Sequence, residues 1–158
     1  MVAATEIPKA FTPPGGWHGE MPPDVLAGCT EPLAAGAPDL RGLWRSVDVT
    51  DNDGGSLPAD HPIRDYVERI EQAGNRVVVT SAGIIHDMYA DGTLENGVND
   101  VLQSDYVTKI SVAATFEDGV LVLRPDGFAG VEIRRWREGS QLRWRYHSLF
   151  TATLERVT

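Results

Sequence analysis

Short runs of hydrophobic residues, alternating with polar ones and separated by turn signals, make up the chain from Gly42 onward. Alternation with a period of two is typical of strands that bury one face. The dipeptides Asp91-Gly92, Asn96-Gly97 and Asp118-Gly119 separate apolar runs, and these residue types tolerate the positive φ that tight hairpins need. The pattern predicts nine or ten strands, over residues 43–49, 66–72, 76–81, 84–90, 93–101, 107–117, 120–123, 130–137, 141–150 and 151–157.

Strands that follow one another through tight turns predict an all-β, antiparallel up-and-down meander. Only residues 60–65 read as a short helical turn, so there is little helix to cover an open sheet. Because closure into a barrel removes exposed sheet edges most completely, we expect a barrel of about eight to ten strands.

The first 41 residues differ in composition from the rest of the chain. Seven of the ten prolines lie here, and they disfavour both helix and sheet. The segment nevertheless carries five large apolar side chains, which a free tail would not need: Phe11, Trp17, Met21, Val25 and Leu26. We therefore divide the chain into an irregular arm, 1–41, and a barrel domain, 42–158. The arm is expected to pack on the barrel or on a second subunit, which leaves a homodimer open.

The triplet Gly42-Leu43-Trp44 on the first predicted strand, with Arg156 on the last, resembles the lipocalins and their calycin relatives. The resemblance implies a lipocalin-like barrel whose arginine packs across the tryptophan and seals the closed end. The run 149–156 is also similar to the closing strand of the haem-binding nitrobindins, in which a histidine on the last strand holds the iron. Leu149 stands at that position here and the glycine-rich first-strand signature is missing, so no cofactor is expected.

Candidate site residues follow from the strand faces. His86 and Met88 share one face of their strand and Tyr89 lies on the other. Trp144 and Tyr146 alternate with Arg143, Arg145 and His147, and either set could face inward. Apolar side chains inside would give a hydrophobic lining, whereas the cationic set inside would suit an anionic ligand. We take Met88, Tyr89, Trp136, Trp144 and His147 as ligand-binding candidates, and His86 and Tyr146 as catalytic ones.

Three function classes remain. The leading one is binding of a small, mostly hydrophobic molecule in the barrel. The second is an isomerase, cyclase or lyase in the same cavity, with His86 as acid or base and Tyr146, Tyr89 or Tyr106 as hydrogen-bond donor. The third is a structural protein with a solid barrel and a dimerising arm. A hollow interior would exclude the third class.

Composition and charge limit the kinds of binding partner that the protein can have. The 158 residues carry a formal net charge of −9, which disfavours nucleic acid and anionic membrane surfaces. The single cysteine, Cys29, excludes an internal disulfide, and the four histidines are too dispersed to predict a metal site. No signal peptide and no apolar run of about 20 residues is visible, so we expect a cytoplasmic protein without a membrane span.

Overall fold

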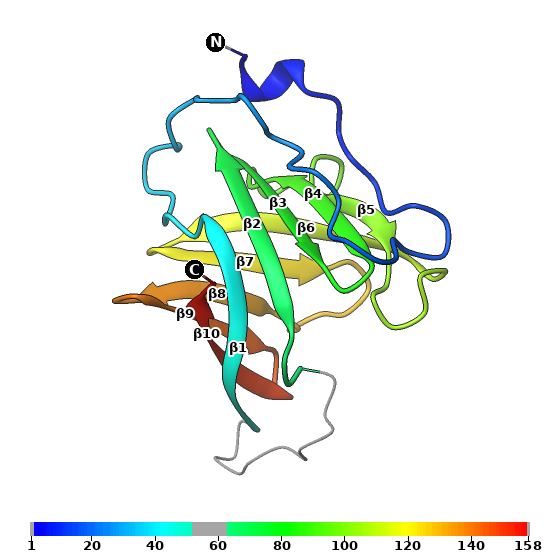
Figure 1. Ribbon diagram of the computed structural model, residues 1–158, viewed down its shortest axis with the longest axis vertical. Helices are drawn as coiled ribbons and strands as arrows, with labels where there is room; N and C mark the ends of the chain where they lie inside the picture. Colours follow the sequence, from blue (N-terminus) through cyan, green and yellow to red (C-terminus); the bar gives the residue numbers. More distant parts are fainter. Residues whose placement is uncertain (1, 52–62, 158) are drawn as a thin grey trace.

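The fold was analysed in a computed structural model, which describes residues 2–51 and 63–157 (Figure 1). After a short 3₁₀ helix, η1 (Ala4–Glu6), ten strands follow: β1 (Gly42–Asp51), β2 (Val67–Ala73), β3 (Arg76–Ser81), β4 (Ile84–Tyr89), β5 (Val98–Val101), β6 (Lys109–Glu117), β7 (Val120–Pro125), β8 (Ile133–Glu138), β9 (Gln141–Tyr146) and β10 (Phe150–Arg156).

The strands form one antiparallel sheet in the order β4-β3-β2-β1-β10-β9-β8-β7-β6-β5. Each strand pairs with its sequence neighbour, except that β1 pairs with β10 and that β4 and β5 are not paired. The sheet curls until β4 and β5 lie side by side, although no ladder joins them in the described part of the chain. The predicted all-β meander barrel is therefore confirmed, with one unpaired seam.

Side chains alternate between the inside of the barrel and its surface, as the pattern predicted. Along β9, Leu142 and Trp144 are buried inside, whereas Arg145 is exposed. The interior core also receives residues from every other part of the barrel, among them Val49, Ile70, Val77, Met88, Val112, Leu121, Ala152 and Leu154. Burial of these side chains is the main force that closes the sheet.

The closed end of the barrel lies around Trp44, which is fully buried. Its indole N–H donates to the carbonyl of Leu40 at 2.9 Å. Trp44 and Arg156 are cross-strand partners, and the guanidinium lies 4.8 Å from the ring centroid. A second guanidinium, that of Arg137, lies 5.5 Å from the same ring. The expected arginine seal over the first-strand tryptophan is present.

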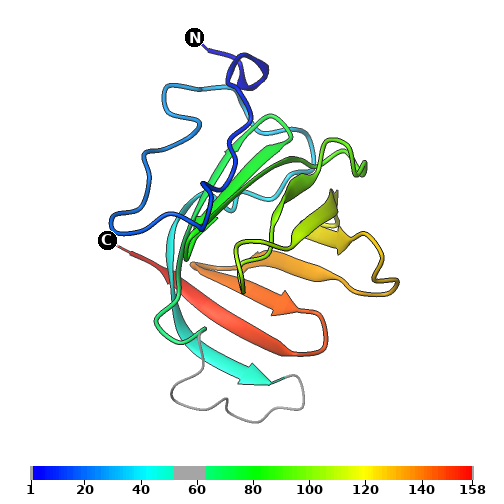
Figure 2. The same ribbon diagram turned by 90° about the vertical axis from the view of Figure 1, so that its right-hand side faces the viewer.

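The arm runs along the outside of β2, β3 and β4, as the blue trace in Figure 2 shows. Ala4, Leu26 and the partly buried Trp17 pack there against Val78 and Ile85, which point away from the barrel interior. All six residues of β3 are consequently buried, because the strand is covered on both faces. The apolar residues of the arm thus find their partners largely on the chain's own barrel, although Phe11 remains 55% exposed.

A buried ion pair fastens the arm. Arg76 and Asp87 lie opposite the arm on β3 and β4, with side chains 1% and 0% exposed. Two nitrogens of Arg76 donate to the Asp87 carboxylate, at 2.9 and 2.6 Å. The same guanidinium donates to the carbonyls of Ala4, Ile7 and Pro8, while Asp87 accepts the backbone N–H of Ala10. One arginine therefore links sheet and arm.

Some element boundaries differ from the prediction. The strand expected over 93–101 is limited to β5, because 91–97 form a loop in which Asp91 bonds Thr93 and Asn96. The last hairpin turns at 147–149, several residues earlier than predicted, and His147 adopts a left-handed φ of 49° there. Residues 60–62 of the helical turn predicted over 60–65 lie outside the described residues, and residues 63–65 form a turn.

Candidate functional site

Two adjoining hollows occupy the barrel and its open end. The inner cavity has a volume of about 90 Å³, and the mouth has about 530 Å³. Five residues line both: Tyr66, Leu102, Gln103, Trp144 and Tyr146. The mouth alone falls within the roughly 300–1,000 Å³ of small-molecule sites. The barrel therefore holds a small inner cavity beneath a wider open mouth.

The wall of the inner cavity is mainly aliphatic. Most of its aliphatic side chains come from the inward positions of the four strands β4 to β7. They are Ile84, Met88, Val98, Ile110, Val112 and Leu123. Ile63 and Phe150 extend the apolar wall into the mouth. Such a wall favours an apolar guest, since transfer from water is favourable in proportion to the apolar area that is covered.

One polar cluster interrupts this wall. Arg135 on β8 forms a fork with Glu68 on β2, with Nε to Oε2 at 2.9 Å and Nη2 to Oε1 at 3.0 Å. The Tyr66 hydroxyl donates to Oε1 of the same carboxylate at 2.8 Å. Glu68 is fully buried and Arg135 is 5% exposed. The cluster is thus an internal salt bridge whose charges compensate each other in a low-dielectric interior.

The surroundings shift the protonation of this cluster. Burial raises the pKa of Tyr66 well above its usual value, and the neighbouring Glu68 charge raises it further. Burial alone would lower the pKa of Arg135, but the charge of Glu68, its hydrogen bonds and the neighbouring Tyr66 together raise that pKa. Tyr66 is therefore a neutral hydroxyl and Arg135 a cation at neutral pH.

Trp144 joins the cluster to the mouth. The Arg135 guanidinium lies 4.7 Å from the centroid of its ring, and the Tyr66 ring lies 4.9 Å from it. Phe150 packs edge-on against the Trp144 ring, with the two ring centroids 5.3 Å apart. The indole N–H of Trp144 is buried and has no hydrogen-bond partner among the residues that the structure describes. A buried donor without a partner is unfavourable, so a guest that offers an acceptor would stabilise it.

His86 closes the unpaired seam from inside. It lines the inner cavity, and its Nε2 lies 3.0 Å from the carbonyl of Val101 on β5. Because a carbonyl only accepts, Nε2 carries the proton in this contact. Burial lowers the pKa of His86 below 6.5, more than the Val101 contact and Asp100 raise it. The imidazole is therefore neutral at pH 7 and bridges two strands that share no ladder.

The arm closes the same seam from outside. The Ala10 N–H donates to Asp87 on β4, and the Thr12 N–H donates to Asp100 on β5, both at 2.9 Å. Between these two contacts, residue 11 of the arm crosses from one strand to the other. The seam is consequently bridged on both surfaces of the barrel wall.

The predicted site residues separate into two groups. His86, Met88, Trp144 and Tyr146 line the inner cavity together. Tyr89 points outward and lies 5.8 Å from the Arg76 guanidinium under the arm, so it is not part of the lining. Trp136 and His147 also lie on the outer surface.

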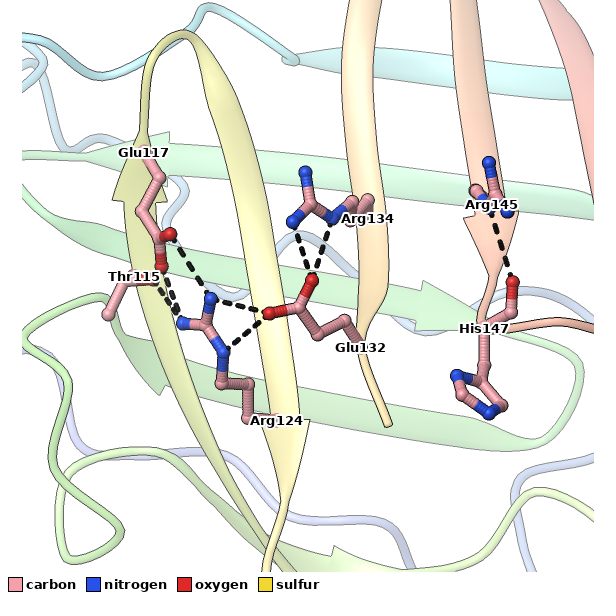
Figure 3. Close-up of polar contacts among 7 residues, drawn as sticks. All are labelled: Thr115, Glu117, Arg124, Glu132, Arg134, Arg145 and His147. Carbon is pink, nitrogen blue, oxygen red and sulfur yellow. Dashed lines mark hydrogen bonds and ion pairs between the residues drawn. The ribbon is translucent and has the colours of Figure 1, made fainter. Parts of the chain in front are cut away.

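Those two outer residues line a shallow hollow of about 430 Å³ on β7, β8 and β9. Figure 3 shows the neighbouring charges: Arg124 lies between Glu117 and Glu132, and Arg134 shares Glu132. Arg145 donates to the backbone carbonyl of His147 at 3.2 Å. The cationic face of β9 therefore lies outside, which settles the orientation left open by the sequence.

Sequence reasoning missed three residues of the site: Tyr66, Glu68 and Arg135. The available signal was the alternation of 131–137, which puts Arg135 on the same face as Ile133. Its partner lies 67 positions away in the chain, so no local pattern could join the two.

Within the described ranges, no three His, Cys, Asp or Glu side chains gather as a possible set of metal ligands. Cys29 is a free thiol in the arm. Within the same ranges, no helix has the length and hydrophobicity that a membrane crossing requires.

Comparisons with known proteins match the architecture alone. No protein-family model matches the chain, and no curated protein resembles its sequence. Among solved structures, human cRBP IV is similar with a TM-score of 0.58 and 17% identity, over 75% of this chain and 98% of that one. Zebrafish ileal bile acid-binding protein, complexed with cholic acid, has a TM-score of 0.55 and 16% identity, over 74% and 98%. The chain therefore shares the β-barrel fold of these two proteins.

Proposed function

We propose that this protein binds a small, mostly hydrophobic molecule in the barrel. The observation that carries the proposal is the pair of adjoining hollows, the inner cavity and the mouth, with their aliphatic and aromatic wall. A core packed at normal density leaves few voids larger than a water molecule, whereas the open end here leaves about 530 Å³. Burying an apolar guest there would gain about 25 cal/mol for each Å² removed from water.

The structural neighbours support a small-molecule ligand in the barrel. One of them is an ileal bile acid-binding protein that was solved with cholic acid. A shared barrel is an argument by analogy, because one fold can host several functions. The proposal therefore rests first on the hollow in this chain and only second on the neighbours.

The alternative function, an enzyme in the same cavity, takes His86 as acid or base and Tyr146 as hydrogen-bond donor. Both residues line the cavity, but the His86 N–H already donates to Val101 across the seam. We propose a structural role for His86, in which the imidazole holds β4 to β5. Met88, Trp144 and Tyr146 remain our candidates for contact with the ligand, and the ligand would reach them through the mouth.

The proposal is tested by titration with Nile red, an uncharged fluorophore whose emission reports an apolar environment. We expect saturable binding of one dye per chain. Ala82 is exposed and lines the mouth, so Ala82→Trp should narrow it with little effect on the core. The variant should weaken dye binding about tenfold or more, because the dye loses the apolar area it would cover.

The matched control is Ala129→Trp, since Ala129 is exposed in the turn between β7 and β8 and lines neither hollow. It should bind Nile red as the wild type does. Absence of saturable binding, or equal weakening in both variants, would contradict binding in the barrel.

A further inference from the structure

The electric charge of the inner cavity determines which guests it can accept. Arg135 is the one permanently charged side chain among the described residues that line it. Glu68 compensates that charge through two hydrogen bonds in a fork, and Tyr66 donates a third bond to the same carboxylate. His86, the other ionisable nitrogen base in the lining, is neutral at pH 7 because burial lowers its pKa. The cavity as a whole is therefore uncharged.

An anionic guest would gain little in such a cavity. A carboxylate placed beside Arg135 would also face Glu68, whose oxygens lie within 3.0 Å of the guanidinium nitrogens. Attraction to the cation and repulsion from the carboxylate would largely cancel, yet the guest would still lose its hydration. Displacing Glu68 instead would leave a fully buried carboxylate without its partner.

A neutral acceptor meets the opposite situation. The guanidinium has five N–H groups, and the fork with Glu68 uses two of them. The indole N–H of Trp144 lies on the ring that Arg135 covers and has no partner in the described structure. A carbonyl or hydroxyl oxygen could accept from such donors without bringing a charge, and its desolvation is much less unfavourable than that of an ion.

The dimensions of the two hollows orient the guest. The inner cavity, at about 90 Å³, is smaller than the roughly 150 Å³ cavity that holds benzene, so it admits one end of a molecule. The mouth has about six times that volume and shares Trp144 and Tyr146 with the inner cavity. The longer part of the guest therefore lies in the mouth.

We propose, as a refinement that rests on the proposed function, that the ligand is an uncharged amphiphile. A single acceptor group, such as a carbonyl or hydroxyl, lies beside Arg135 and Trp144. An apolar body extends outward between Leu102 and Tyr146. Carboxylates of the same shape are excluded by Glu68.

Competition against Nile red with two molecules of equal shape tests this. Octanoate and 2-nonanone carry the same heptyl chain, and the ketone replaces one carboxylate oxygen with a methyl group. We expect 2-nonanone to displace the dye at a concentration at least about tenfold lower than octanoate does, at pH 7.5. Equal potency, or stronger displacement by octanoate, would overturn the inference while leaving binding in the barrel intact.

Glu68→Gln provides the sharper arm of the test. The substitution keeps the shape of the side chain and removes the charge that compensates Arg135. Octanoate should then gain about tenfold or more in affinity, while 2-nonanone should change by less than about threefold. An unchanged preference for the ketone would contradict the assigned role of Glu68.

Trp144→Phe keeps the inference testable if Glu68→Gln does not fold. Loss of the indole N–H should weaken 2-nonanone about threefold or more, because one hydrogen bond of ordinary strength is removed. Trp136→Phe makes the same replacement on the outer surface and should leave both affinities unchanged. Equal effects of the two replacements would argue against an acceptor beside Trp144.

Discussion

The ion pair of Arg76 and Asp87 offers the strongest test of how the arm is held. We expect Arg76→Met to lower the free energy of unfolding by about 3–5 kcal/mol, since the substitution leaves a buried carboxylate without its cation. The pair is 1% and 0% exposed, so solvent does not screen it. The three arm carbonyls of Ala4, Ile7 and Pro8 lose their donor in the same step. The loss is a large fraction of the roughly 5–15 kcal/mol that stabilises a typical domain.

Urea unfolding followed by tryptophan fluorescence measures this loss. With a slope of about 2 kcal/mol per molar urea, the midpoint should fall by about 2 M. Arg41→Met is the matched control, because Arg41 pairs with Asp39 at 2.8 Å while both side chains are about half exposed. Exposed pairs contribute about 0–1 kcal/mol, so this variant should unfold almost as the wild type does.

Replacement of both partners separates the ion pair from the packing around it. Arg76→Met combined with Asp87→Leu removes both buried charges and should be more stable than Arg76→Met alone. If Arg76→Met unfolded at the same urea concentration as Arg41→Met, the pair would not fasten the arm, and the reasoning would be wrong.

Three further predictions concern pH, the closed end and the outer surface. Burial lowers the pKa of His86 in the folded protein, so the unfolded chain binds the imidazole proton more tightly. The free energy of unfolding should therefore fall as the pH drops below 6.5. His86→Gln should reduce this dependence on pH, as measured by urea unfolding at several pH values. Arg156→Gln should lower the unfolding temperature by a few degrees, because a cation–π contact with Trp44 is worth about 0.5–2 kcal/mol. The Arg124 guanidinium lowers the pKa of Glu117 to about 2, so the stabilisation by this exposed pair is present above pH 4.5 and is lost toward pH 2. At neutral pH, 1 M salt should screen the pair, so that wild type and Glu117→Gln have the same free energy of unfolding.

The fold was readable from the sequence because its turns are marked by local chemistry. Asp118-Gly119 connects β6 to β7 as predicted, with both residues at positive φ. The contact between Trp44 and Arg156 could also be predicted, because the resemblance to lipocalins includes both residues. The strand predicted over 93–101 was too long, because the side chain of Asp91 organises a loop there. Its hydrogen bonds to Thr93 and Asn96 leave no trace in the hydrophobic pattern of the sequence.

The sequence predicted only part of the candidate site. Alternation along β9 puts Trp144 and Tyr146 on one face and the cationic residues on the other, but it leaves the inward face open. Burying an arginine without a partner is unfavourable, which favours the apolar face inside. Arg135 is nevertheless buried inside, because its partner Glu68 comes from a distant strand. A buried ion pair of this kind is a property of the closed barrel, so it becomes visible only when β2 and β8 face each other.

The central claim, that a small molecule occupies the barrel, is tested most directly by methyl NMR. With isotope-labelled isoleucine methyl groups, Ile84, Ile110 and Ile133 report the inner cavity, while Ile7 and Ile85 report the arm and the outer face of β4. We predict that saturating 2-nonanone shifts the three cavity signals and leaves the two outer ones in place. Shifts confined to Ile7 and Ile85, or none at all, would contradict binding in the barrel.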